Sequence, residues 1–365
     1  PNDLQSFSGQ ITNLIFLLSS QCKGAVAVGS YFIALNYYII KEYGPEWYNK
    51  LDCVVTSEHS LISRTLRDSI HKAFKQFVWG INQPAGNRSY QSPFTNVSYY
   101  DRTYFESLFG EFYYPDGSQP EWKAIDTVQR LFMDWFNKVR LKQVLTFPVE
   151  TFAMVHDGTD IIDKEYKELC AEMYSKGHSF FTYISDSADS LASCCRLRNE
   201  MSENTFSPTS GLTGVKTGSC NVITLNMNRI IQNYFREHVH ADDIIAGECA
   251  YLWREEPTAI SEFVTYLTRI LQRVYKYHIA YKTMLYEWEA RGMFASSNGG
   301  YINIKDLFST IGINGLNEAA EFIGLTVSNN PEYIQFLQLV LGTIKELNKH
   351  YSIHDKKRPY LFNSE

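Results

Sequence analysis

The chain has 365 residues, of which 44% are hydrophobic and 20% are charged, so it can bury a large core and is not disordered. Its net charge of −6 argues against binding a nucleic-acid polymer, which needs a basic face, but leaves nucleotides as small ligands. Seven Cys are too few for a disulfide scaffold of this length. We therefore expect reduced thiols and a cytoplasmic location.

Hydrophobic periodicity predicts long helices along the chain. Two apolar helices come first, at Ser6–Ser20 and Ala25–Tyr43. The apolar stretch Ala25–Ile40 is short of a full membrane span and contains Asn36, so we expect buried helices and no membrane segment. The later predicted helices cover Ser60–Val78, Glu121–Arg140, Pro257–Gly292 and Pro331–His350.

Short β-type runs lie between these helices, and several are apolar on both faces, as is typical of strands that are covered on both sides. Their alternation with long helices predicts an α/β fold with parallel strands. Because no repeat or linker divides the chain, we expect one domain over residues 1–365. The predicted strands are Ser92–Tyr99, Val144–Val155, Ser179–Ser185, Cys220–Met227, Phe308–Ile313 and Tyr360–Asn363.

Two adjacent cysteines, Cys194 and Cys195, follow the predicted strand Ser179–Ser185 on a loop. Such a pair can form a strained disulfide, supply a nucleophile or carry a thiyl radical. The alternative is that both are ordinary small buried residues, because free Cys is among the most buried residue types. Spacing alone leaves these interpretations open.

Three further segments carry polar groups without fixing a function. The glycines of Gly211–Ser219 suggest a phosphate cradle, but the GK[ST] order is absent and a strand follows. These features favour a flexible loop that closes over a site. The amides in Pro84–Asn96 form either a satisfied core network or a ligand-orienting set. His238 and His240 share a face only in an extended segment, so a solvated helix end is favoured over a metal site.

Five ordered motifs resemble those of the anaerobic (class III) ribonucleoside-triphosphate reductases. The resemblance implies a ten-stranded α/β barrel of the glycyl-radical type, incomplete at both ends of this chain. It also implies reduction of ribonucleoside triphosphates to deoxyribonucleoside triphosphates for DNA synthesis. The motifs are Gln91–Asn96 (QSPFTN), Phe147–Met154 (FPVETFAM), Cys194–Leu197 (CCRL), Thr217–Ile230 with TGS and VITLN, and Thr310–Ala320 (TIGINGLNEAA).

The same resemblance assigns roles to single residues. Cys195 matches the catalytic Cys that becomes a thiyl radical and removes the ribose 3′ hydrogen inside the barrel. A closed apolar interior that excludes water suits such chemistry. Ser219 stands where other members carry an Asn that contacts the ribose, and its reach is shorter. The implied substrate-binding residues are Gln91, Ser92, Phe94, Asn96, Cys194, Ser219 and Asn226.

Other parts of the family pattern are missing from this chain. The glycyl-radical loop, a four-Cys structural zinc site, an N-terminal ATP cone and a second barrel Cys are not found, and Cys22 and Cys53 are poor replacements. We therefore expect a fragment that is inactive alone. The resemblance further implies dNTP or ATP effectors and formate or a thiol as reductant. The implied partners are a radical-SAM iron–sulfur activating enzyme and a second copy of the chain, bound through helices within Leu4–Phe77.

Two alternatives stay open at the level of sequence. An acyltransferase of the pyruvate formate-lyase type also uses adjacent Cys on a barrel loop, and Cys194 and Cys195 would suit it. The contexts Gln91–Asn96 and Cys195–Leu197 favour the reductase. A module that binds nucleotides or dimerises without catalysis is the non-enzymatic alternative.

Overall fold

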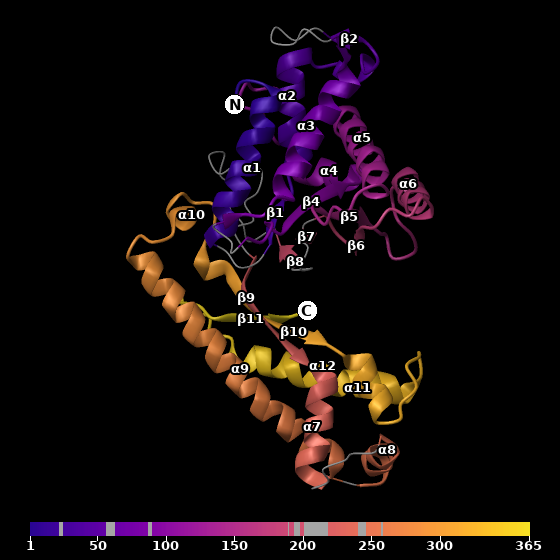
Figure 1. Ribbon diagram of the computed structural model, residues 1–365, viewed down its shortest axis with the longest axis vertical. Coiled ribbons are helices and arrows are strands. Elements are labelled where there is room, and N and C mark those ends of the chain that lie inside the picture. Colours follow the sequence, from indigo (N-terminus) through magenta and orange to yellow (C-terminus); the bar gives the residue numbers. More distant parts are fainter. Residues whose placement is uncertain are drawn as a thin grey trace. The chain divides into compact units, whose positions relative to one another are not determined.

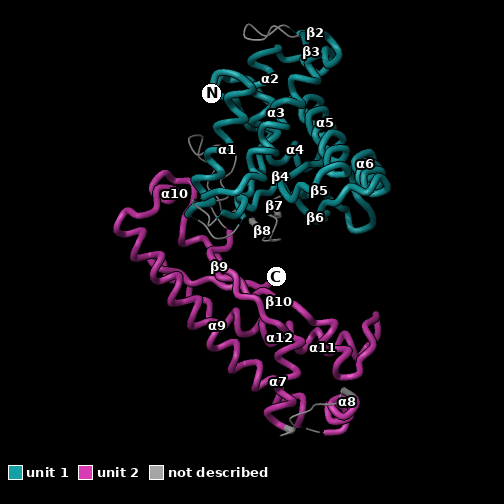
Figure 2. The backbone as a smooth tube through the Cα atoms, in the orientation of Figure 1, with its two compact units in different colours: residues 1–215 teal, residues 216–365 magenta. Residues whose placement is uncertain are grey.

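The computed structural model divides the chain into two compact units, Pro1–Val215 and Lys216–Glu365 (Figure 2). Each unit has its own hydrophobic core. The single domain expected over residues 1–365 stays a prediction. The structure describes residues 1–21, 25–55, 63–86, 90–188, 190–192, 198–200, 218–239, 246–256 and 258–365.

Unit 1 contains a four-stranded sheet in the order β1-β4-β5-β6 (Figure 1). All three neighbouring pairs are parallel, which confirms the α/β prediction. Two short antiparallel pairs, β2 with β3 and β7 with β8, lie outside this sheet. The strands are β1 (Val26–Val28), β2 (Val54–Val55), β3 (Arg64–Thr65), β4 (Thr95–Tyr100), β5 (Val149–Val155), β6 (Phe181–Ser185), β7 (Ser190–Ala192) and β8 (Arg198–Glu200).

The helices of unit 1 bury aromatic side chains against this sheet. Phe32 stacks on Tyr99 of β4, and Phe132 meets Phe32 edge to face. Such ring pairs add specific geometry to the free energy gained from apolar burial. The helices are α1 (Leu4–Gln21), α2 (Tyr31–Tyr43), the 3-10 turn η1 (Trp47–Asn49), α3 (Leu66–Ile81), α4 (Arg102–Phe109), α5 (Trp122–Arg140) and α6 (Lys164–Ser175).

Polar side chains fix where several of these helices begin. Thr65 accepts a hydrogen bond from the backbone of Asp68, whose carboxylate accepts one from the backbone of Thr65, so α3 starts in a capping box. Asp101 and Asp163 cap α4 and α6 through the backbone N–H groups of Tyr104 and Tyr166. These caps satisfy donors that have no partner inside the helix.

The prediction of one helix over Ala25–Tyr43 is wrong in its first part. Val26–Val28 forms β1, which pairs in parallel with β4 through Thr95–Val97, and the helix begins only at Tyr31. Three residues are too few to show a strand periodicity, so the apolar run merged with the following helix. The strand completes the edge of the sheet beside the motif Gln91–Asn96, and so helps to position that motif.

Unit 2 contains a three-stranded parallel sheet in the order β11-β10-β9. Its strands are β9 (Gly218–Asn226), β10 (Leu307–Asn314) and β11 (Leu361–Ser364). Helices pack on one face of this sheet, where Leu225, Ile311 and Phe362 join the main core of the unit. The helices are α7 (Met227–Val239), α8 (Ala246–Glu255), α9 (Ala259–Ala290), α10 (Ala295–Asn298), the 3-10 turn η4 (Ile304–Asp306), α11 (Leu316–Phe322) and α12 (Pro331–Tyr351).

The described strands form open sheets, and none of them closes on itself. The structure therefore supports a mixed α/β fold with parallel sheets, which is coarser than the ten-stranded barrel expected from the sequence. None of the helices in the described residues is both long and apolar enough to cross a membrane.

Candidate functional site

A row of polar side chains crosses the three strands of the unit 2 sheet. The hydroxyl oxygens of Ser219 on β9 and Thr310 on β10 lie 2.8 Å apart. Thr310 Oγ1 in turn donates to Asn363 Oδ1 on β11, at 2.7 Å. Since Thr310 donates its hydroxyl hydrogen to Asn363, Ser219 is the donor between the two hydroxyls, and its Oγ also lies 3.2 Å from the backbone oxygen of Asn221. One hydrogen-bonded row thus links all three strands.

Strand alternation places this row on the sheet face that turns away from the helices. Ile311 directly follows Thr310, and Phe362 directly precedes Asn363. Both Ile311 and Phe362 are buried in the core beneath the helices. Successive side chains of a strand point to opposite faces, so Thr310 and Asn363 point the other way. The expected substrate residue Ser219 belongs to this row.

In unit 1, the expected substrate residue Asn96 lies fully buried on β4. Its Nδ2 donates to the backbone oxygen of Val149 at 3.1 Å and to Thr151 Oγ1 at 3.0 Å, both on β5. Its Oδ1 is buried and accepts no hydrogen bond within the described residues. A buried acceptor without a partner is unusual and costly, and is found most often where a ligand, water or further segment completes the site.

The other expected residues of the Gln91–Asn96 motif sit at the approach to β4. Gln91 is exposed and pairs through its backbone with Ala85. Ser92 donates from Oγ to the backbone oxygen of Asn82, at 3.1 Å. The Phe94 ring is 41% exposed and meets Phe147 edge to face, with 4.8 Å between ring centres. Backbone and side-chain contacts together therefore hold the motif in place.

Asn226 lies at the opposite end of β9 from Ser219 and makes a helix cap. Its Oδ1 accepts from the backbone N–H of Arg229 at 2.9 Å, in the first turn of α7. This structural role accounts for its amide, and its binding of substrate stays a prediction.

Several expected residues lie outside the described part of the chain. These include the cysteines Cys194 and Cys195, most of the Gly211–Ser219 segment, and His240. His238 is described, and its Nδ1 lies 2.7 Å from the backbone oxygen of Tyr234, one turn earlier in α7. The described residues contain no group of three His, Cys, Asp or Glu that could hold a metal ion.

Sequence reasoning did not single out three residues that the structure brings into these polar groups. Thr151 pairs with Asn96, while Thr310 and Asn363 extend the row from Ser219. Each is a polar residue within a predicted strand or a quoted motif. Their strand alternation was a usable signal, but the pairing across strands depends on register, which sequence does not fix.

A buried carboxylate forms a second polar cluster in unit 1. Glu150 on β5 accepts hydrogen bonds from the Tyr99 hydroxyl and from Arg140 Nη1, the latter at 3.3 Å. His178 Nε2 lies 2.7 Å from its Oε2. Glu150 points to the face opposite to Thr151, so this cluster ties β4 and β5 to α5 and belongs to the core.

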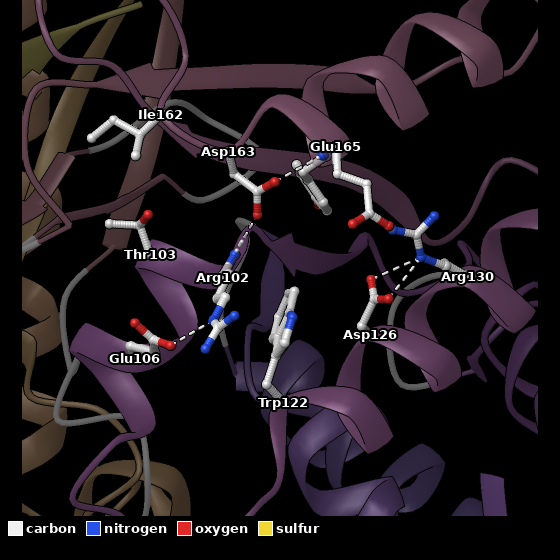
Figure 3. Close-up of a pocket in the computed structure, with 10 residues that line it drawn as sticks. Arg102, Thr103, Glu106, Trp122, Asp126, Arg130, Ile162, Asp163 and Glu165 are labelled. Atoms are coloured by element: carbon white, nitrogen blue, oxygen red, sulfur yellow. Dashed lines mark hydrogen bonds and ion pairs between the residues drawn. The ribbon is translucent and has the colours of Figure 1, made fainter. Parts of the chain in front are cut away.

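A pocket of about 310 Å³ lies on unit 1, lined by residues of α4, α5 and the start of α6 (Figure 3). Asp163 accepts from the backbone N–H groups of both Arg102 and Tyr166, so one carboxylate joins two helix N-termini. Arg102 pairs with Glu106 at 2.7 Å. Ion pairs and Asp163 therefore hold much of the lining in place.

The opposite wall of the pocket is also internally paired. Arg130 contacts Asp126 at 2.8 Å and Glu165 at 2.9 Å. Burial raises the pKa of Asp126, and the hydrogen bond from Arg130 offsets part of this effect. Because its charged groups already bind one another, the pocket gives no sign of the ligand that it would take.

The sequence model of one protein family, the anaerobic ribonucleoside-triphosphate reductases, matches residues 1–363 of this chain. The chain belongs to this family. The match agrees with the order of the five motifs and favours the reductase over the acyltransferase alternative. No curated protein sequence matches this reductase-family chain.

Solved structures of the same family resemble the fold of this reductase-family chain. The anaerobic ribonucleotide reductase of Thermotoga maritima in complex with dATP and CTP has a TM-score of 0.73 at 24% identity. The structure of that protein with dATP in its specificity site has a TM-score of 0.74 at 22% identity. Each covers 100% of this chain, which spans 54% and 56% of the two solved chains. This chain is thus similar to about half of a larger reductase.

Proposed function

We propose that this chain forms the central part of an anaerobic reductase that converts ribonucleoside triphosphates to deoxyribonucleoside triphosphates. The observation that carries the proposal is the family match over residues 1–363, which includes all five motifs. The polar groups around Asn96 and Ser219, in two of these motifs, supply hydrogen-bonding side chains of the kind that hydroxyl-rich substrates need.

The finer fold that we propose is the ten-stranded barrel of the glycyl-radical enzymes. Parallel strands, such as those of the four-stranded and the three-stranded sheets, are the kind that build its wall. In a barrel, alternate side chains of every strand face the interior. Asn96 with Thr151, and Ser219 with Thr310 and Asn363, would be such interior residues.

Cys195 is the proposed catalytic residue. A glycyl radical in another part of the enzyme would supply the oxidising equivalent by taking the hydrogen atom of the thiol. Cys195 would then form an S–H bond with the 3′ hydrogen atom of the ribose while the C–H bond breaks. This exchange moves a hydrogen atom and needs no base beside the thiol.

The remaining residues would bind and orient the substrate. Ser219 and Thr310 offer hydroxyls held by the row across β9, β10 and β11, and Asn96 offers an acceptor that no described residue occupies. Gln91, Ser92 and Phe94 would shape the neighbouring loop, and Cys194 would lie beside the reacting thiol. Asn96, Ser219 and Thr310 lie on strands, and this attachment favours precise orientation of the reacting atoms.

The whole enzyme would need groups and partners beyond these residues. We propose dNTP or ATP effectors, formate or a thiol as reductant, and structural zinc outside this chain. A radical-SAM iron–sulfur enzyme would install the radical, and two copies would pair through helices in residues 4–77. We place the enzyme in the cytoplasm, where thiols stay reduced.

The adjacent cysteines allow a sharp test of this assignment. In the complete enzyme, activated without oxygen, Cys195→Ala should lower deoxynucleotide formation to the background level. The matched variant Cys194→Ala removes a proposed substrate-binding neighbour but keeps the thiol that exchanges the hydrogen atom, so it should lower activity far less than Cys195→Ala. Deoxynucleotide is measured chromatographically from a ribonucleoside triphosphate.

Binding of the same ribonucleoside triphosphate, measured calorimetrically, is the control for an intact fold. Turnover retained by Cys195→Ala would remove that residue from the mechanism. Equal loss in both variants would instead favour chemistry that uses the two thiols together.

A further inference from the structure

A fully buried lysine of α9 lies beneath the unit 2 sheet. The Lys282 side chain is 0% exposed, and its Nζ donates to the backbone oxygen of Leu307 at 2.5 Å. A second backbone oxygen, that of Lys305, lies 3.5 Å away. No ion pair reaches Lys282 among the described residues, and Asp306 only attracts its ammonium group from a distance, so burying this charge is costly. Its contacts to the backbone therefore suggest a specific role.

The two carbonyl groups belong to the segment that leads into β10. Lys305 lies in the 3-10 turn η4, and Leu307 is the first residue of β10. Directly after this point the pairing of β9 and β10 shifts: Ser219 pairs with Phe308, whereas Asn221 pairs with Ser309. Lys282 is thus anchored beside an irregularity of the sheet.

The irregularity is a β-bulge in which Cys220 is the extra residue. Cys220 is 5% exposed and shares a small core with Leu285 and Leu307, on the helix side of the sheet. Leu225, which also lies on the helix side, comes an odd number of residues after Cys220 on β9. A regular strand would put these two side chains on opposite faces, so the bulge is what allows both to be buried.

The bulge also decides where Ser219 points. Without it, a regular strand that keeps Leu225 in its core would turn Cys220 away from the helices and Ser219 toward them. With it, Cys220 and Leu225 stay buried, while Ser219 reaches Thr310 on the opposite face. Bulges commonly re-aim side chains beside active sites in this way. The position of the Ser219 hydroxyl therefore depends on the local geometry at the start of β10.

We propose that Lys282 is a positioning residue for substrate binding, which acts by holding the start of β10 and the bulge that directs Ser219 toward Thr310 and Asn363. This inference rests on the proposed substrate-binding role of the sheet face that turns away from the helices. Lys282 itself touches no substrate, because it lies on the other side of the sheet. Its ammonium group binds the backbone at the start of β10, and this backbone determines where the Ser219 hydroxyl lies relative to Thr310.

The test compares Lys282→Met with Lys282→Arg in the complete enzyme. Met keeps the length of the side chain but cannot donate, so kcat/KM for deoxynucleotide formation should fall on the order of tenfold to a hundredfold. Thermal stability should stay unchanged or rise, because a buried charge has been removed. Arg keeps the donor and should restore part of the activity. Lys276→Met, on the exposed face of α9, is the matched control and should change neither quantity.

A double-mutant cycle with Ser219→Ala separates positioning from general damage. If Lys282 acts through Ser219, then Lys282→Met should lower kcat/KM little further in the Ser219→Ala background. Additive losses, or a loss of activity that follows a loss of thermal stability, would overturn the inference. So would full activity of Lys282→Met. An unsubstituted enzyme that forms no deoxynucleotide would instead overturn the proposed function.

Discussion

At the scale of single residues, two buried polar side chains hold β4 to β5 from opposite faces of the sheet. Asn96 spans the strands on one face through Val149 and Thr151, and Glu150 gathers Tyr99, Arg140 and His178 on the other. Both therefore affect stability as well as the geometry of the site.

The change Asn96→Ala should lower the free energy of unfolding by about 1–3 kcal/mol, because the Thr151 hydroxyl loses its amide partner in a buried position. Urea denaturation of the chain measures this loss. Asn96→Asp should be at least as harmful, since the carboxylate cannot donate to the Val149 carbonyl. If the variants and the unsubstituted chain gave the same unfolding curves in urea, this would contradict the described contacts of Asn96.

The change Glu150→Gln should cost about 3 kcal/mol, since removing the charge of Glu150 leaves that of Arg140 uncompensated. Arg140 can reach water in part, which keeps the cost at the lower end. The matched control is Glu172→Gln, which breaks an exposed pair with Lys176 and should change stability by less than about 1 kcal/mol. Equal effects in the two variants, again in urea, would argue against the buried cluster.

At the scale of elements, α9 carries a buried histidine and a buried lysine toward the sheet. His278 lies one turn before Lys282, near Thr310 of β10 and Phe362 of β11. Burial lowers the pKa of His278 to about 4, and the Thr310 backbone offsets only part of this effect. The folded chain therefore holds this imidazole neutral at pH values where an unfolded chain protonates it.

Stability should consequently fall as the pH drops from about 6.5 to 4, since only the unfolded state then gains a proton at this site. The loss from His278 should reach about 1–3 kcal/mol. Its share is measured as the difference between the original chain and His278→Leu, which keeps the other titrating groups. The variant should show a flatter dependence on pH, and parallel curves would show that His278 does not titrate this way.

Element positions were largely predictable, because long amphipathic helices have a clear periodicity. Glu121–Arg140 and Pro331–His350 correspond closely to α5 and α12. The three-residue strand β1 was not predictable, and neither was the bulge at Cys220, which depends on pairing with β10. Local sequence determines periodicity, but strand register follows from tertiary packing.

At the scale of the whole molecule, the motif order was the decisive signal. It indicated the family that the match over residues 1–363 confirms, and the alternation of strands and helices indicated parallel sheets. The site was predictable only in part. Asn96 and Ser219 lie within polar groups, whereas Asn226 caps a helix, and Cys195 lies outside the described residues. Hydrogen bonds across strands, such as that from Thr310 to Asn363, require the folded register.

The most direct test of the account is a product assay on the complete enzyme that contains this chain. The enzyme is activated without oxygen and given a ribonucleoside triphosphate, or pyruvate with coenzyme A, in separate reactions. The proposed reductase should form deoxyribonucleoside triphosphate in the first reaction and no acetyl-coenzyme A in the second. Acetyl-coenzyme A, or an activated enzyme that leaves the ribonucleotide unchanged, would contradict it.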